Sequence, residues 1–102
     1  MSEAVMLTKV KNALGITSTD TRITSEIEDL IAAARADLKG AGILMTEVDH
    51  DPLITQAIKT YCRANFRSPA DADRLKASYD EQKGTLMNST HYTNWRDGHG
   101  AC

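Results

Sequence analysis

A single apolar stripe in the middle of the chain constrains the fold more than any other feature. Between residues 23 and 38 the apolar side chains recur every three or four positions: Ile23, Ile27, Leu30, Ile31, Ala34 and Leu38. This period is that of an α-helix with one buried face. Thr19 or Asp20 can cap its first free amides, and Gly40 and Gly42 follow its last apolar residue. We therefore predict an amphipathic helix between these caps.

Two further segments with the helical period flank this stripe. The first ends at Gly15, a residue that favours a helix C-cap, and its apolar positions are Val5 or Met6, Leu7, Val10 and Leu14. The other begins with Pro52 after the capping residue Asp51 and runs to about Asn65. Its apolar positions cover a wide arc: Leu53, Ile54, Ala57, Ile58, Tyr61, Cys62 and Phe66. We expect this third helix to be the central one, since a wide apolar arc needs neighbours on several sides.

A fourth helix is predicted from Ser68, as the cap, and Pro69 at the first helical position. Asp71 lies in its first turn, and its apolar stripe is narrow: Ala72, Leu75, Tyr79 and Leu86. Gly84 weakens the last turn by about 1 kcal/mol relative to alanine. The segment AGILMTEVDHD between the second and third helices is predicted to be a connector whose Ile43 and Leu44 reach the core.

The period disappears after Asn88, where Ser, Thr, Asn, Gly and Asp dominate. We therefore predict an all-α fold, a small bundle of about four helices with an extended C-terminal tail. The expected division is a helical domain at residues 1–88 and an extended or flexible tail at residues 89–102. The sequence shows no internal repeat, no coiled-coil heptads and no β-rich region.

The composition limits the classes of function. The 102 residues suffice for one domain with a marginal core, and 12 Lys plus Arg against 14 Asp plus Glu give a net charge of −2. This balance disfavours nucleic acid as the main ligand. No apolar run resembles a signal peptide or is long enough to span a bilayer, so we expect no membrane contact. The two cysteines, Cys62 and Cys102, suit reduced thiols in a reducing compartment.

Candidates for chemistry are few. His50 lies between two aspartates before a helix, but a capping-loop histidine without a nucleophile motif or glycine-rich phosphate loop is a weak catalytic candidate. His91, His99 and Cys102 could offer zinc three ligands, although their spacing matches no compact metal motif. Cys62 on an apolar helical face reads as a core residue. We expect no catalytic residue, no cofactor and no metal.

A basic strip is predicted along the third helix, because Lys59, Arg63 and Arg67 recur at four-residue spacing. The strip could meet phosphates, could be a solvated face, or could pair with carboxylates of a neighbouring subunit. A DNA-binding helix-turn-helix would need a turn of three to four residues, which the long connector before the third helix does not provide.

The stretch NSTHYTNW places two of the five aromatic residues, Tyr92 and Trp95, beyond the last helical pattern. One interpretation is that these rings fold back over the narrow stripe of the fourth helix. The other is that they bind a partner, since aromatic side chains bury a large area with few rotors to immobilise. The sequence favours neither, and the two can coexist.

Four segments carry a family resemblance: MLTKVKNALGI, ITSEIEDLIAAARADL, DPLITQAIKTYCRANF and SYDEQKGTLMNSTHYTNW. In this order and at this length they resemble the head-tail connector proteins of tailed bacteriophages, also called head-completion or adaptor proteins. The resemblance covers about Met6 to Trp95. In the last segment it is carried by Tyr79, Lys83, Leu86, Tyr92 and Trp95. The final RDGHGAC has no counterpart in the family.

The resemblance implies a structural protein rather than an enzyme. It implies a ring of copies of this chain, typically dodecameric, beneath the portal of a DNA-filled capsid, made in the host cytoplasm and retained in the virion. The implied partners are the portal protein, a stopper or tail-completion protein, and genomic DNA that passes through the channel without sequence-specific binding. Tyr92 and Trp95 would be interface anchors, with Lys59, Arg63 and Arg67 as further interface candidates. The alternative is a small helical DNA-binding or packaging accessory protein.

Overall fold

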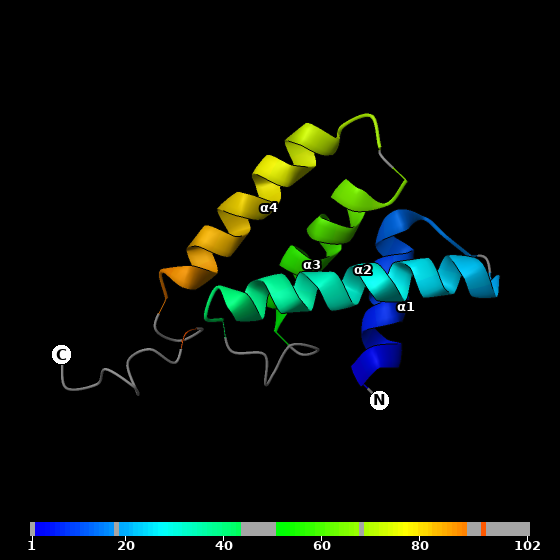
Figure 1. The fold of residues 1–102 in the computed structure, drawn as a ribbon, viewed down its shortest axis with the longest axis horizontal. Coiled ribbons are helices and arrows are strands. Elements are labelled where there is room, and N and C mark those ends of the chain that lie inside the picture. Colours follow the sequence, from blue (N-terminus) through cyan, green and yellow to red (C-terminus); the bar gives the residue numbers. More distant parts are fainter. Residues whose placement is uncertain (1, 18, 44–50, 68, 90–92, 94–102) are drawn as a thin grey trace.

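Four α-helices make up the fold in the computed structural model, which describes residues 2–17, 19–43, 51–67, 69–89 and 93. In chain order these are α1 (Ser2–Leu14), α2 (Thr21–Gly40), α3 (Pro52–Asn65) and α4 (Ala72–Met87). The predicted all-α class and the number of helices are confirmed. Figure 1 shows the long α2 crossing the molecule, with α1 and α4 on opposite sides of α3.

Aspartate caps begin the second and third helices as the sequence predicts. The Asp20 carboxylate accepts a hydrogen bond from the Arg22 amide at 2.7 Å. The Asp51 carboxylate accepts hydrogen bonds from the amides of Leu53 and Ile54, and Pro52 occupies the first turn. Each cap satisfies amide groups that have no partner inside the helix.

Glycines in the left-handed region end the first two helices. Gly15 has φ +72° and Gly42 has φ +91°. After each glycine the next amide donates back to a carbonyl five residues earlier, from Ile16 to Lys11 and from Ile43 to Leu38. This is the Schellman arrangement, in which a residue without Cβ adopts the turn at little cost. Gly40, by contrast, is the last residue of α2 itself.

The core lies mainly among α1, α2 and α3, where the predicted stripes meet, and it also takes in residues of α4 and of the connector. It contains Met6, Val10, Ile27, Ile31, Ala34, Leu38, Ile43, Ile54, Ala57, Ile58, Cys62, Tyr79 and Leu86. Seven residues of α3 are buried, more than in any other helix described, so its predicted central position is confirmed. Of the two alternatives predicted for the start of the first stripe, Met6 is the buried residue and Val5 is 42% exposed. One predicted apolar position of α3 is wrong, because Leu53 is 50% exposed. Leu53 lies in the first turn of α3, where the opposing end of α4 leaves its side chain partly uncovered.

The fourth helix packs mainly on α3, with Leu75, Tyr79 and Leu86 buried as predicted. Its predicted start is wrong, since it begins at Ala72 after a turn in which the Ala72 amide donates to the Pro69 carbonyl. The Asp71 side chain makes no capping bond and instead accepts a hydrogen bond from Arg74. The predicted cap Ser68 lies outside the described residues. The helix continues through Gly84 to Met87.

Chain segments beyond the helices meet at the C-terminal end of α2. Ile43 is buried and forms an isolated antiparallel bridge with Thr93, which is also buried. The Thr93 amide and hydroxyl both donate to the Ser89 carbonyl. The other predicted core residue of the connector, Leu44, lies outside the described residues. The bridge joins the start of the 41–51 connector to the chain after α4.

Candidate interaction surfaces

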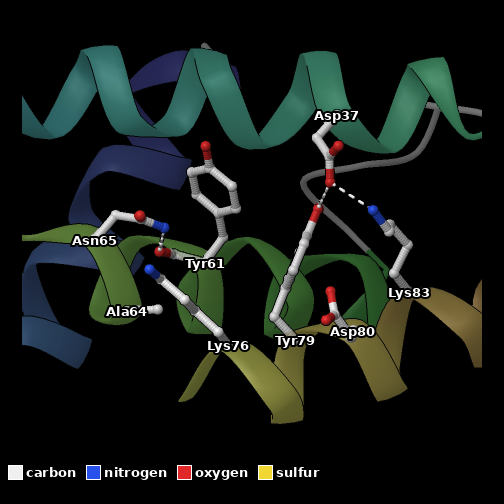
Figure 2. A pocket seen from close by; sticks show the side chains of 8 residues that line it. All are labelled: Asp37, Tyr61, Ala64, Asn65, Lys76, Tyr79, Asp80 and Lys83. Carbon is white, nitrogen blue, oxygen red and sulfur yellow. Dashed lines mark hydrogen bonds and ion pairs between the residues drawn. The ribbon is translucent and has the colours of Figure 1, made fainter. Parts of the chain in front are cut away.

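A polar cluster joins α4 to α2. The Tyr79 hydroxyl donates to Asp37 Oδ2 at 2.5 Å, and Lys83 Nζ donates to the same oxygen at 3.0 Å (Figure 2). Tyr79 and Lys83 are four residues apart, so one face of α4 presents both groups to the α2 carboxylate. We call Asp37, Tyr79 and Lys83 the Asp37 clamp.

The protonation states of the Asp37 clamp suit a structural contact between α2 and α4 and not a reactive group. The hydrogen bonds from Tyr79 and then Lys83 keep the pKa of Asp37 below its ordinary value. Burial, followed by the hydrogen bond to Asp37, raises the pKa of Tyr79 above its ordinary value. At neutral pH the carboxylate is therefore charged and the phenol protonated, which is the pair of states that makes the strongest bond between them.

A polar hollow of about 330 Å³ opens beside the Asp37 clamp. Figure 2 shows Tyr61 standing next to Tyr79, and their rings meet edge to face with centroids 5.2 Å apart. Lys76 and Asp80 of α4 complete its charged lining. Two carboxylates and two ammonium groups balance one another there, so the hollow presents no excess charge to attract an ionic ligand.

Arg67 does not extend the predicted basic strip along α3. The helix ends at Asn65, and Arg67 adopts φ +57°, a left-handed conformation rare for a residue with a side chain. Its guanidinium bonds both carboxylate oxygens of Glu26 in α2, with a shortest distance of 2.9 Å, and lies 5.1 Å from the Phe66 ring centroid. The hydrogen bond from Arg67 lowers the pKa of Glu26. Arg67 thus fixes the end of α3 to α2.

Lys59 and Arg63 remain on α3 as the residues of the strip. Arg63 is exposed and Lys59 half-buried, and neither forms an ion pair within the described part of the chain. Residues 41–51 join α2 to α3, which is longer than the turn of a helix-turn-helix. These two side chains therefore leave a small basic surface and not a DNA-reading motif.

A second, apolar hollow lies where the start of α3 meets the end of α4. We call it the α3–α4 hollow; it measures about 120 Å³ and is lined by Leu53, Gln56, Gln82, Thr85 and Leu86. The 43% exposed side chain of Met87 follows directly in sequence. The Gln82 side-chain oxygen Oε1 is buried and has no hydrogen-bond partner among the described residues. Because buried acceptors are ordinarily hydrogen-bonded, this unpaired oxygen in an apolar lining marks the α3–α4 hollow as a candidate interaction surface.

A protein-family model decides what this arrangement of helices belongs to. The model described as phage connector protein matches residues 6–93, from the first core residue of α1 to Thr93 at the bridge with Ile43. The chain belongs to the phage connector protein family. A search of curated proteins and a search of solved structures each found no match.

The connector's remaining candidates divide by whether the structure describes them. His50, His91, His99 and Cys102, together with Tyr92 and Trp95, lie outside the described residues. Cys62 is a buried core thiol, as predicted, and burial raises its pKa to about 12. Within the described ranges no group of three or more His, Cys, Asp or Glu side chains could hold a metal ion. No helix in those ranges is long and apolar enough to cross a membrane.

Sequence reasoning missed two features of the connector. Asp37 lies outside the apolar stripe from which α2 is predicted, yet it is the acceptor for both α4 donors. The pairing of Tyr79 with Lys83 one turn later was the available signal, since two donors on one face need an acceptor opposite them. Gln82 of the α3–α4 hollow gave no signal, because a glutamine in an amphipathic helix is ordinarily solvated.

Proposed function

We propose that this connector forms a ring beneath the portal vertex, joins the DNA-filled head to the tail and extends the DNA channel. The supporting observation is the family match over residues 6–93, which includes all four helices from Met6 onward. In this proposal the ring is a dodecamer of identical chains. Its partners are the portal protein on one side and a stopper or tail-completion protein on the other.

The proposed role is structural rather than catalytic. The polar cluster that most resembles a reactive site, the Asp37 clamp, has its carboxylate bonded by two donors of the same chain. The net charge of −2 suits a channel wall past which DNA moves, since a strongly basic wall would hold the phosphates. The protein would be made in the host cytoplasm and retained in the virion.

Two groups of residues are the proposed contacts with partners. Tyr92 and Trp95 would anchor the segment after α4 on the portal or on an adjacent subunit. Lys59 and Arg63, whose charges have no ion-pair partner in the described residues, would face carboxylates of a neighbour. Arg67 would add to this surface with the 56% of its side chain that the Glu26 ion pair leaves exposed. In this proposal residues 1–88 are the connector domain and residues 89–102 the tail that reaches outward.

Light scattering and electron microscopy of the purified connector, across a concentration series and with purified portal added, test the proposal. We expect a helical monomer or weak oligomer that forms rings at high concentration or on the portal. Changing Tyr92 and Trp95 together to Ala should weaken portal or neighbour binding at least about tenfold while helicity stays intact. A connector that neither forms rings nor binds portal would contradict the proposed function.

A further inference from the structure

The α3–α4 hollow combines apolar walls with one buried hydrogen-bond acceptor. Leu53 and Leu86 provide its apolar walls, from the first turn of α3 and the last turn of α4. Leu53 is 50% exposed, so half of a leucine side chain meets solvent at the rim. Covering such a surface with an apolar group is favourable because it removes apolar area from water.

The unsatisfied atom in the lining narrows the chemistry of that group. Gln82 Oε1 is buried and lacks a partner among the described residues, and an acceptor in that state destabilises the fold until a donor reaches it. An aliphatic side chain would cover the walls but leave this oxygen unpaired. The fitting group is a flat apolar body with one N–H or O–H at its edge.

The chain itself contains one side chain of this description beyond its last described residue. Trp95 is the only tryptophan, and an indole is an apolar ring system whose single polar atom is a donor. Arg96 follows it in the sequence. On α4, the exposed Glu81 directly precedes Gln82 and lies one turn before Thr85 of the lining. A basic residue beside the donor therefore matches an acidic residue beside the acceptor.

We propose that the α3–α4 hollow of one copy receives the Trp95 indole of a second copy, with the indole N–H donating to Gln82 Oε1. The inference rests on the proposed function, because it names the contact through which copies assemble. The hollow and Trp95 are different parts of one chain, so each copy gives one indole and receives another. Such head-to-tail pairing closes into a ring when the rotation between copies permits it.

One indole buries only about 150 to 250 Å², far less than a stable interface needs. Isolated copies should therefore associate weakly, and repetition around the ring or binding to the portal should stabilise the contact.

A mixing experiment with two complementary variants tests the pairing. The variant Trp95→Ala keeps an intact hollow and has no tryptophan, whereas Leu53→Glu keeps Trp95 and places a charge on the rim of the hollow. Glutamate in the first turn of α3 suits the helix dipole, so Leu53→Glu should fold normally, which circular dichroism checks. Each variant alone should self-associate at least about tenfold more weakly than the unchanged protein.

In the mixture only the Leu53→Glu copies carry a tryptophan, so the fluorescence reports one side of the contact. Titrating Trp95→Ala into Leu53→Glu should shift the emission to shorter wavelength and raise the mass seen by sedimentation. Val5→Glu is the matched control, because Val5 is an exposed apolar residue in an early turn of α1 that does not line the hollow. It should self-associate like the unchanged protein.

A second experiment tests the proposed hydrogen bond from the Trp95 indole to Gln82. Trp95→Phe keeps an aromatic ring but removes the donor, and it should weaken association several-fold when Gln82 is present. In a Gln82→Leu background, where the acceptor is absent, the same change should have a clearly smaller effect, since the pair is then already broken. Equal effects in both backgrounds would contradict the assigned bond.

An unchanged spectrum throughout the titration overturns the proposal. If the unchanged protein also shows short-wavelength emission at every concentration, Trp95 docks within its own chain and not on a second copy. If the protein without substitutions still forms rings or binds portal, the proposed function stands and only this contact is wrong. If it does neither, the connector proposal fails together with the inference.

Discussion

The bundle of α1, α2 and α3 and the single helix α4 are stabilised in different ways. In the bundle, aliphatic side chains such as Met6, Ile31 and Ile58 are fully buried among three helices. The fourth helix has one main neighbour, α3, and three buried residues, and it gains a polar attachment to α2 through the Asp37 clamp. The bundle is thus stabilised mainly by the apolar area that it buries. The fourth helix, with its narrow apolar face, depends in addition on the hydrogen bonds of the Asp37 clamp.

This difference predicts two levels of stability within one chain. Opening α4 alone exposes Leu75, Tyr79 and Leu86, whereas opening the bundle exposes nearly the whole core. Local openings of this kind cost less free energy than global unfolding and are visible as faster amide exchange. Substitutions in the two regions should therefore differ in the size of their effect on stability. They should also differ in which part of the chain they make easier to open.

The largest effect should come from the bundle. Ile31→Ala removes three carbon atoms from a fully buried position on α2 and should lower the free energy of unfolding by about 2 to 5 kcal/mol. Urea denaturation followed by circular dichroism measures this loss. Ile23→Ala, at a half-buried position on the same helix, is the control and should cost clearly less. Equal losses at the two positions would show that the core is not centred where the structure places it.

The next effect concerns two glycines and should differ in sign. Gly42→Ala puts a Cβ on a residue at φ +91°, so it should destabilise the end of α2 by about 1 to 2 kcal/mol. Gly84→Ala lies inside α4, where an added Cβ meets nothing within 4 Å, and should stabilise by about 0.5 to 1 kcal/mol. Thermal melts of both variants give the comparison. A loss of stability with Gly84→Ala would indicate that α4 needs glycine at this position for a reason other than helix formation.

A smaller effect should be confined to α4. Tyr79→Phe keeps the ring against Tyr61 but removes the donor to Asp37, and it should cost about 1 kcal/mol. Amide exchange should become faster in α4 and stay unchanged in α1 and α2. Tyr61→Phe is the control, because no hydrogen bond of the Tyr61 hydroxyl occurs among the described residues. Uniformly faster exchange in all four helices would contradict two separable levels of stability.

The smallest effect is a dependence on pH through the Asp37 clamp. The folded protein holds the pKa of Asp37 below its ordinary value of 3.8, so the folded state binds fewer protons than the unfolded state. The stabilisation is therefore complete above about pH 4 and is lost as the pH falls through the lowered pKa. Because the Asp37 side chain is 41% exposed, solvent screens the interaction and the contribution is modest.

Asp37→Asn should make the loss of stability on acidification shallower, measured as urea midpoints between about pH 5 and pH 2. Glu26 contributes a slope of the same sign through its bond with Arg67, so Glu26→Gln serves as the comparison variant. If the urea midpoint of Asp37→Asn falls with pH as steeply as that of the unchanged protein, the Asp37 clamp does not contribute to the stability of α4.

The sequence predicted the bundle because apolar periodicity and caps are local signals. Asp51 before Pro52 specifies the start of α3, and the stripe from Ile27 to Leu38 specifies the buried face of α2. The two donors of the Asp37 clamp show in the spacing of Tyr79 and Lys83, but their acceptor does not, because Asp37 lies 42 and 46 residues away from them in the chain. The exposure of Leu53 was missed for the same reason, since it depends on where α4 ends against α3.

Alkylation of the buried Cys62 thiol can report when the core of the molecule opens. A thiol reacts with alkylating reagents as the thiolate, and with a pKa of about 12 almost none is present at neutral pH while the core is closed. Each modification of Cys62 therefore marks an event in which α3 was uncovered. In a protein whose other cysteine, Cys102, has been replaced, the rate of labelling would count those events for the helix that both regions of the molecule share.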